Sequence, residues 1–398
     1  MRIAMVSREY PPWGCGIATY TDKTSRALAA LGHQVDVISE APKGWPNDYV
    51  EAGVHVRRLL DPLAKPREYK AMRRAASVNR ALNQYGPYDI VQACEWDGEA
   101  AVYALRQRAP LVTRLATPHY LVERINAVGT TEKLRTAIVK TMERTQTRLS
   151  AQVISPSACL ADVIAQDWDL ERGRIQVVPT GITTPTFDGN ASLPNGLDNT
   201  PFVIFFGKLE TRKGIKTWID ALPRVLAQNP ELVAVFAGDD LGVGGVSAQS
   251  YAMQVCAAFR NRLVFLARVP QQELFKLVAR ARMAVLPSLW ESLANVCLEA
   301  MALGRPVVST TGSGFAEVIT DGVDGILVAP GDSAALADAV NRALADPMRL
   351  ERLGAAALQR ASDFNLDRMA RLLVDVYERV LEDRPRIHNP ALSQVASK

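Results

Sequence analysis

The strongest structural signal lies in residues 283–332, whose sequence is MAVLPSLWESLANVCLEAMALGRPVVSTTGSGFAEVITDGVDGILVAPGD. A short apolar run at residues 283–286 predicts a buried strand, and a second strand is expected over residues 306–309. Between these strands, Asn295 can cap a helix that ends at Gly304. Strands that alternate with helices in this way are typical of a parallel α/β sheet.

Two acids stand out in this stretch, Glu291 in the expected loop and Glu299 inside the expected helix. Helix geometry alone does not align them, so the loop must fold back for both to point into one cleft. Between them lies a helix N-terminus whose free N–H groups, on residues 296–298, favour an anion. An anion beside two carboxylates suits a ligand with phosphate at its centre and hydroxyls at both ends. A nucleotide-diphosphate sugar has this form.

Taken alone, two glutamates at this spacing are more often solvated surface groups. In this setting, however, Glu291 and Glu299 resemble the E-x7-E motif of retaining GT-B glycosyltransferases of the family 4 type. Further segments that resemble the family follow at residues 304–308, 317–319, 324–328 and 330–332. The resemblance implies an α/β fold of two doubly wound, Rossmann-like domains that face each other across a cleft. It covers the whole chain and is strongest over residues 202–332.

The composition is that of a soluble, globular protein. The chain has 398 residues, 48% of them apolar and 22% charged, and its length favours two domains. A formal net charge of +4, without zinc-finger or basic-zipper patterns, argues against nucleic-acid binding. The five cysteines show no C-x-x-C spacing, which argues against a disulfide framework and a zinc site. Without a signal peptide or a spanning apolar run, we expect a cytoplasmic protein, with peripheral association at the inner membrane face as the alternative.

Two glycines near the N-terminus mark a candidate ligand loop. Gly14 and Gly16 separate the first expected strand, residues 2–7, from a helix over residues 17–31. Glycines at a helix start allow a phosphate to approach the backbone closely. The pattern is not G-x-G-x-x-G, because position 19 is Thr. It resembles the family's N-terminal loop, which implies a place near the donor phosphates and the acceptor.

Residues 65–80 are strongly basic, with six Lys or Arg and a single acid. An apolar stripe at helical spacing is formed by Ala71, Ala75, Val78 and Leu82. One interpretation is a helix whose charged face is simply solvated. The other is a docking site for an acidic membrane surface or an anionic acceptor.

The resemblance implies a histidine at the end of the strand expected over residues 110–115. Family members commonly place a histidine there, in contact with the donor sugar, but the corresponding position in this chain is Ala116. His119 follows three residues later. Either His119 supplies the imidazole from a shifted loop, or the group is absent.

The second domain carries cations directly after its first strand. The segment that begins with Gly207 and Lys208, and the later Lys213, resemble family positions at which two cations hold the diphosphate. Family members usually have an arginine at the position of Lys208, and a lysine lacks the bidentate fork of an arginine. Arg212, next to Lys213, is the alternative partner of the diphosphate. The acids at residues 239–240 follow the next strand, but the resemblance implies no metal, and we interpret them as loop acids.

The resemblance also implies individual roles. Glu299 would take the ribose hydroxyls and Glu291 a hydroxyl of the donor sugar, without acting as a covalent nucleophile. Lys208 and Lys213 would stabilise the departing diphosphate, and His119 completes the candidate catalytic set. The remaining candidate donor-binding residues are Gly14, Gly16, Gly207, Arg212, Leu293, Ala294, Asn295 and Val296.

The expected activity is therefore metal-independent sugar transfer, with retention, from a nucleotide-diphosphate sugar to a sugar, lipid or small-molecule acceptor. No cofactor is expected besides the donor substrate. The alternatives are a non-catalytic nucleotide-sugar-binding subunit and another GT-B enzyme such as a nucleotide-sugar epimerase. The expected divisions are a first domain (1–182), a linker (183–200), a second domain (201–365), a helix crossing back (366–384) and a polar tail (385–398).

Overall fold

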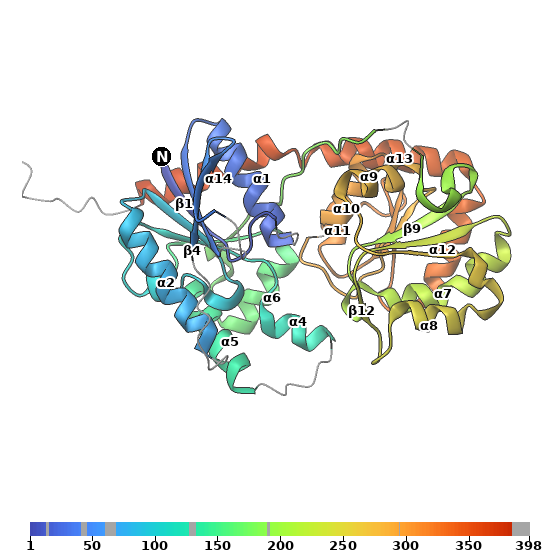
Figure 1. Ribbon diagram of the computed structural model, residues 1–398, viewed down its shortest axis with the longest axis horizontal. Helices are drawn as coiled ribbons and strands as arrows, with labels where there is room; N and C mark the ends of the chain where they lie inside the picture. Colours follow the sequence, from blue (N-terminus) through green and yellow to red (C-terminus); the bar gives the residue numbers. More distant parts are fainter. Residues whose placement is uncertain are drawn as a thin grey trace, which may run out of the picture.

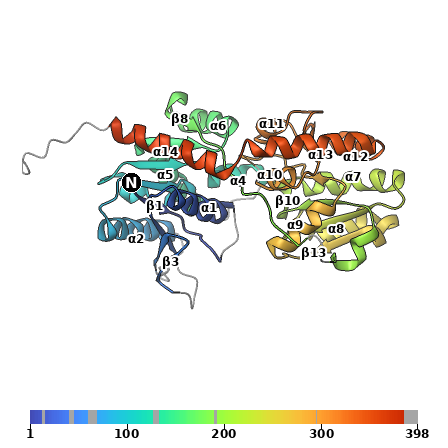
Figure 2. The same ribbon diagram turned by 90° about the horizontal axis from the view of Figure 1, so that it is seen from above.

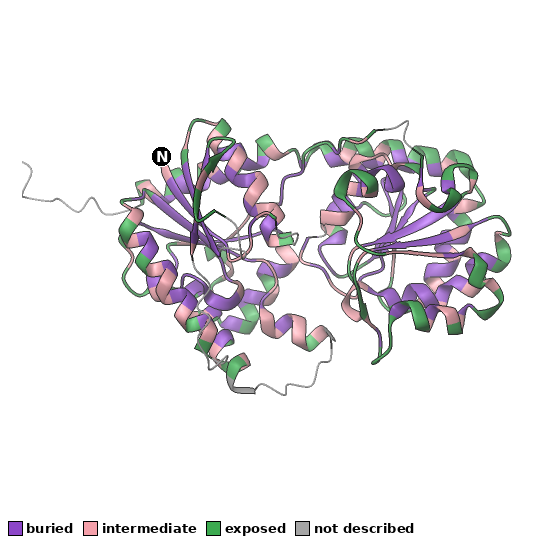
Figure 3. Cartoon of the chain, in the orientation of Figure 1, coloured by how far each residue is buried: buried purple, intermediate pink, exposed green. Residues whose placement is uncertain are grey.

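The computed structural model describes residues 1–12, 16–40, 46–59, 69–126, 133–188, 192–293 and 295–383. The chain forms two α/β units side by side, each with its own central sheet (Figure 1). Buried residues concentrate on the strands of both sheets, whereas the outer helix faces are exposed (Figure 3).

The first unit is an eight-stranded sheet with helices packed around it. Its strands are β1 (Arg2–Val6), β2 (Gln34–Glu40), β3 (Asp48–Glu51), β4 (Val54–Leu59), β5 (Ile90–Cys94), β6 (Leu111–Arg114), β7 (Gln152–Ser155) and β8 (Ile175–Val177). Its helices are α1 (Gly16–Ala30), α2 (Lys70–Tyr85), α3 (Ala101–Ala104), α4 (His119–Asn126), α5 (Lys133–Leu149) and α6 (Ala158–Trp168), with the 3-10 turns η2 (Trp96–Gly98) and η3 (Arg172–Arg174). The strand order is β3-β4-β2-β1-β5-β6-β7-β8, and only the β3–β4 pair is antiparallel.

The second unit is a six-stranded parallel sheet in the order β13-β11-β9-β14-β15-β16, with β10 and β12 paired separately. Its strands are β9 (Phe202–Phe206), β10 (Leu209–Glu210), β11 (Val233–Ala237), β12 (Asp240–Gly242), β13 (Leu263–Leu266), β14 (Ala284–Val285), β15 (Val307–Thr310) and β16 (Ile326–Val328). Its helices are α7 (Ile215–Gln228), α8 (Ala248–Val255), α9 (Gln271–Arg280), α10 (Asn295–Ala302), α11 (Phe315–Val318), α12 (Ser333–Leu344) and α13 (Pro347–Ser362), with the 3-10 turns η4 (Pro194–Asn199), η5 (Thr211–Lys213) and η6 (Ala257–Arg262).

The central strands are mostly apolar because helices cover both faces of each sheet. In β1, Ile3 and Met5 pack into one hydrophobic cluster, whereas Ala4 and Val6 pack into another on the opposite face. Alternate side chains of a strand point to opposite faces. A parallel strand buried on both sides therefore has a continuous apolar sequence. This arrangement confirms the doubly wound α/β fold class expected for both halves.

The last helix, α14 (Leu366–Glu382), returns from the second unit and lies along the first; both ribbon views show this crossing (Figures 1 and 2). Leu373 and Val376 are buried in the core of the first unit. The Tyr377 hydroxyl, also buried, donates to Gln92 Oε1 at 2.7 Å. The final helix thus ties the two units together through apolar packing and one buried hydrogen bond.

The two chain connections between the units are bonded to each other. The Ile182 amide donates to the Phe364 carbonyl at 2.8 Å, and the Leu366 amide donates to the Ile182 carbonyl at 3.0 Å. A Cβ added at Gly181 would lie 2.7 Å from the Leu366 Cα. A side chain at this position would push the two connections apart.

Part of the expected linker is packed rather than free. Residues Pro194–Asn199 form η4, and Leu193 and Leu197 are buried in the core of the second unit. The two leucines lie four residues apart, so one short turn brings both onto the same face. The last part of residues 183–200 is therefore packed into the second unit, and the expected domain division stays a prediction.

The basic segment contains a helix with the expected apolar stripe. The four stripe residues are all buried: Ala71, Ala75, Val78 and Leu82. However, Arg74 is only 4% exposed; its Nε donates to Glu40 and its NH1 donates to Asp97 at 3.1 Å. In the docking interpretation, Arg74 therefore cannot be one of the cations that face the partner. Residues 65–68 lie outside the described ranges, and within those ranges no helix is both long and apolar enough to cross a bilayer.

This burial separates Arg74 from Arg80, which is exposed on the same helix. Arg74→Met should lower the free energy of unfolding by about 3–5 kcal/mol, because it leaves the buried Glu40 carboxylate without this partner and takes one of two cations from Asp97. Arg80→Met is the matched control and should change it by less than about 0.5 kcal/mol. Urea unfolding followed by circular dichroism measures both. Equal effects of the two substitutions would contradict this account.

Candidate active site

A glycine holds the cationic turn η5 against the loop that carries Glu291. Gly214 ends η5 with a φ of +70°, and a Cβ at this position would lie 1.7 Å from the Pro287 carbonyl oxygen. The Leu289 amide donates to the Arg212 carbonyl at 2.8 Å. Only a residue without a side chain permits this approach. The side chains of η5 are thereby fixed beside Glu291.

The Glu291 side chain is buried among these cations. The residue is 5% exposed. Its Oε1 accepts hydrogen bonds from Lys213 Nζ, from Arg212 NH1 at 3.1 Å and from Ser288 Oγ at 3.3 Å. Burial acts to raise the pKa of the Glu291 carboxyl, but the neighbouring Lys213 and Arg212 outweigh it, and the pKa is lowered. Glu291 is therefore a carboxylate at neutral pH and can accept hydrogen bonds.

The candidate Lys208 lies apart from this cluster. Its side chain is exposed. The preceding residue, Gly207, has a φ of +119°. A Cβ added at Gly207 would lie 4.0 Å from Val296 Cγ1. The end of β9 therefore approaches the first turn of α10. Lys208 lies just beyond the end of β9, and its exposed side chain can contact an anion.

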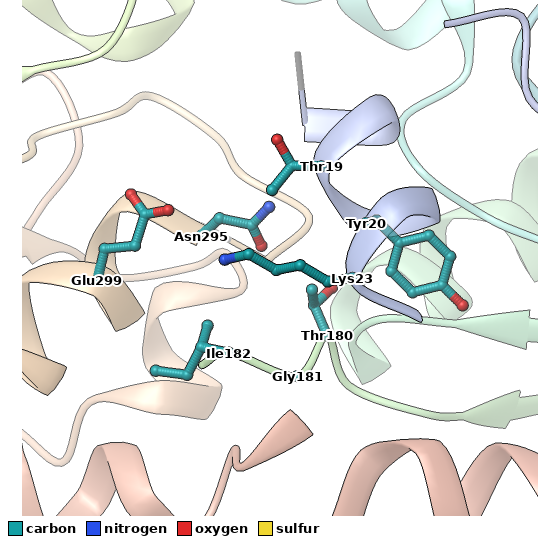
Figure 4. A pocket seen from close by; sticks show the side chains of 8 residues that line it. All are labelled: Thr19, Tyr20, Lys23, Thr180, Gly181, Ile182, Asn295 and Glu299. Atoms are coloured by element: carbon teal, nitrogen blue, oxygen red, sulfur yellow. The ribbon is translucent and has the colours of Figure 1, made fainter. Parts of the chain in front are cut away.

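The second glutamate of the motif lines a pocket between the two units. The pocket is lined by Thr19, Tyr20, Lys23, Thr180, Gly181, Ile182, Asn295 and Glu299. Figure 4 shows the Lys23 side chain reaching from α1 toward Asn295 and Glu299. Burial raises the pKa of the Glu299 carboxyl to about 7, and Lys23 only partly opposes this. The two acids of the motif thus have opposite electrostatic environments.

The other candidates near α10 differ in what they can contact. Asn295 begins α10, and its side chain lines the pocket (Figure 4). Val296 is half-buried. Leu293 is only 8% exposed and its side chain packs in the core of the second unit, so a ligand contact there would involve its backbone, and its binding role stays a prediction. Ala294 lies outside the described residues.

Comparison with known proteins identifies the family. Residues 193–360 match the model of glycosyl transferases group 1, and residues 14–185 match that of glycosyltransferase family 4. The chain is 31% identical to the glycogen synthase of Mycobacterium tuberculosis, over 95% of this chain and 94% of that protein. The chain belongs to the family 4 glycosyltransferases. The resemblance inferred from the sequence is thus confirmed.

Solved structures place the glycosyltransferase in the GT-B fold. Sucrose-phosphate synthase from Thermosynechococcus elongatus superposes with a TM-score of 0.78 at 22% identity, over 96% of this chain and 100% of that one. The Anabaena protein HepE, in complex with UDP-glucose, superposes with a TM-score of 0.72 at 19% identity, over 95% of this chain and 100% of that one. The expected GT-B architecture is therefore confirmed.

His119 of this glycosyltransferase has its polar contacts in the first unit. It begins α4, and its Nδ1 lies 3.3 Å from Glu123 Oε1. Its amide donates to Glu143, and its ring centroid lies 5.3 Å from that of Trp96. Ala116 donates its amide to Glu95 at 2.7 Å. None of these bonds reaches Glu291 or its cations, although α4, which His119 begins, lies against the turn η5 that carries Arg212 and Lys213.

The N-terminal glycines are only partly described. Gly16 begins α1 and is exposed, and a Cβ added there would meet no atom within 4 Å. Gly14 lies outside the described residues. A ligand role for the two glycines therefore stays a prediction.

One of the two acids after β11 has a structural task. Asp240 accepts hydrogen bonds from the amides of Gly242 at 3.0 Å, Ala248 at 2.8 Å and Gln249 at 3.0 Å. It thereby satisfies the first amides of α8. Within the described ranges, no group of three His, Cys, Asp or Glu side chains is placed to hold a metal. The absence of a metal requirement stays a prediction.

Sequence reasoning missed the residues that the first unit brings to the pocket. Thr19, Tyr20 and Lys23 of α1 line the same pocket as Glu299. Their spacing puts them on neighbouring parts of one helix face, which was the available signal. Which part of the second unit faces them depends on how the two units pack. Local sequence carries no information on that packing.

The position of Glu299 has a consequence for stability. Its pKa in the folded protein, about 7, lies above the ordinary value of 4.5. The unfolded chain therefore loses this proton at lower pH than the folded protein, and ionisation of Glu299 destabilises the fold as the pH rises through this range. Glu299→Gln should raise the melting temperature by a few degrees at pH 8 and leave it unchanged at pH 4.

Differential scanning calorimetry at the two pH values measures this effect. Glu351→Gln, at an exposed position on α13, is the matched control and should leave the melting temperature unchanged at both. A Glu299→Gln protein that is less stable than the wild type at pH 8 would contradict the electrostatic account.

Proposed function

We propose that this glycosyltransferase moves a sugar from a nucleotide-diphosphate donor to an acceptor hydroxyl, with retention at the anomeric carbon and without a metal ion. The observation that carries the proposal is the pair of glutamates flanking the first turn of α10. Glu291 is held ionised by Lys213 and Arg212, whereas Glu299 lies in the pocket between the units. Cations and carboxylates at adjoining positions match the phosphates and hydroxyls of such a donor.

In this proposal the donor lies across the carboxyl ends of the second sheet, where doubly wound folds bind ligands. Its ribose hydroxyls donate to Glu299, and a hydroxyl of its sugar donates to Glu291. The diphosphate accepts hydrogen bonds from the N–H groups at the N-terminus of α10. Lys213 and Arg212 contact both the diphosphate and Glu291. The exposed Lys208 adds a further positive charge. A structure of HepE contains UDP-glucose, which supports the choice of a nucleotide sugar.

The residues act mainly by stabilising charge. As the bond from the anomeric carbon to the diphosphate oxygen breaks, negative charge develops on the leaving group, close to Lys213 and Arg212. The acceptor oxygen bonds to the anomeric carbon on the same face, and its proton passes to the leaving phosphate. Removing one such stabilising donor typically raises a barrier by about 3–4 kcal/mol. Glu291 is engaged by two cations, so we do not assign it as a covalent nucleophile.

The similar proteins do not point to one acceptor, because their named activities differ. One is a glycogen synthase and another is a sucrose-phosphate synthase. A sugar, a lipid and another small molecule all remain candidates. Docking of an anionic membrane or acceptor on residues 65–80 would depend on cations other than Arg74, which is buried. The location of the protein in the cell stays a prediction.

A non-catalytic nucleotide-sugar-binding subunit is the second candidate function. It is favoured by Ala116 at the position where the family has a histidine and by the place of His119, whose Nδ1 lies 3.3 Å from Glu123 Oε1. Donor hydrolysis or transfer by the purified protein separates this candidate from an enzyme. Binding of a nucleotide sugar without any turnover across an acceptor panel would favour the subunit.

The main test begins with a thermal-shift screen of nucleotide sugars, followed by transfer assays with the best donor. We expect a product whose anomeric configuration, read by proton NMR, equals that of the donor. Glu299→Gln should weaken nucleotide binding by about tenfold or more, because hydrogen bonds to a charged group contribute roughly 1.5–3 kcal/mol. An inverted product would refute retention, and unchanged affinity in the folded variant would refute the ribose role.

The proposal also makes a prediction about metal. Because Lys213 and Arg212 supply the positive charge that a divalent ion supplies elsewhere, transfer should continue at an unchanged rate in excess chelator. Initial rates with and without chelator provide the measurement. Loss of activity that magnesium or manganese restores would contradict this proposal.

A further inference from the structure

A carboxylate from the second unit satisfies the N-terminus of a helix in the first unit. Glu317 lies on α11, and its two oxygens accept hydrogen bonds from the amides of Ala158 and Cys159, each at 2.7 Å. Ser157 caps α6 separately, because its side chain accepts from the Leu160 amide. Helix N-terminal amides attract negative charge, and hydrogen bonds to a carboxylate are stronger than neutral ones. Glu317 thus forms a two-bond contact between the units.

The helix that carries Glu317 is attached to the loop of Glu291. The Gly314 amide, at the start of α11, donates to the Glu291 carbonyl at 2.9 Å. A Cβ at Gly314 would lie only 2.1 Å from the Ser292 carbonyl oxygen, so the two segments are in close contact. At its other end, α11 is held by α13, where Arg360 donates to the Glu317 carbonyl at 3.1 Å.

The first unit also contacts the Glu291 loop directly at this point. Cys159 Sγ lies 3.9 Å from the carbonyl oxygens of both Glu291 and Ser292. Trp290 packs against a hydrophobic cluster of the first unit that includes Leu160. The backbone of Glu291 therefore lies between α11 on one side and the start of α6 on the other.

We propose that Glu317 is a positioning residue: its bond to the start of α6 holds the two units closed and thereby fixes the Glu291 loop for transfer. The inference rests on the proposed function of Glu291. When the contact is broken, the first unit is no longer held against the carbonyls of Glu291 and Ser292. The carboxylate of Glu291 then keeps its cations but loses its fixed place relative to the first unit.

Both carboxylate oxygens of Glu317 are used, which makes a sharp substitution available. Glu317→Gln keeps the size of the side chain but turns one acceptor into an NH2 group, which cannot accept from a backbone amide. The second variant changes the other partner: Ala158→Pro removes one amide donor from the first turn of α6. Proline is tolerated at the first helical position, and Ser157 already has the extended backbone, φ −150° and ψ 157°, that a following proline favours.

The experiment measures closure and catalysis separately, on the full chain. Small-angle X-ray scattering should give a larger radius of gyration for Glu317→Gln than for the wild type. With the donor found by the thermal-shift screen, kcat for transfer should fall about 10- to 100-fold. Ala158→Pro should also increase the radius of gyration and lower kcat. The double variant should have no larger radius of gyration and no lower kcat than Glu317→Gln, because the two substitutions break the same contact. Glu351→Gln is the control and should change neither.

Each contrary outcome overturns the proposal. An unchanged radius of gyration in both single variants shows that the contact does not hold the units closed, whatever reaction the protein catalyses. A larger radius with an unchanged kcat shows that closure does not position Glu291. Additive effects of the two substitutions show that they act through different contacts. Since scattering requires no turnover, failure of the closure proposal is distinguishable from failure of the proposed activity.

Discussion

The buried ion cluster around Glu291 is the constraint on which the site depends. A carboxylate removed from water destabilises the fold by several kcal/mol unless it is paired, and Lys213 and Arg212 supply that pairing. The pairing requires η5 to touch the glutamate loop, which in turn requires a glycine at position 214. The loop that carries Glu291, the turn η5 and the ion pairs between them therefore depend on one another. In the proposed donor complex, a phosphate would meet cations that are already ordered, which lowers the entropy lost on binding.

The two glutamates of one motif show how environment sets the role of a residue. Glu291 has cations on its carboxylate and a lowered pKa. Glu299 is desolvated with incomplete compensation from Lys23 and has a raised pKa. An acid left under-compensated in this way weakens the folded state once it is ionised. Hydroxyl donors from a ligand would supply the hydrogen bonds that the protein itself does not.

The sequence predicts well those features that arise from local periodicity. Continuous apolar strands and the stripe on α2 follow from burial, and both are found where expected. Charge placement was harder to predict, because Arg74 lies beside that stripe and only tertiary contacts with Glu40 and Asp97 decide that it is buried. Likewise, Lys23 could be placed on a helix face, but not opposite Glu299. That the Leu293 side chain packs in the core was not predictable either, because core and ligand-facing positions look alike within a motif.

The paired connections at Gly181 and Leu366 limit how the two units can move relative to each other. The chain crosses between them twice, and the two crossings are hydrogen-bonded at Ile182. Two adjacent tethers of this kind act as a single pivot, so they restrict translation of one unit past the other more than rotation. Any opening of the units would therefore be mainly a rotation about this point. The edge farthest from the pivot travels the greatest distance, so small angular changes there are enough to admit or exclude water and substrate.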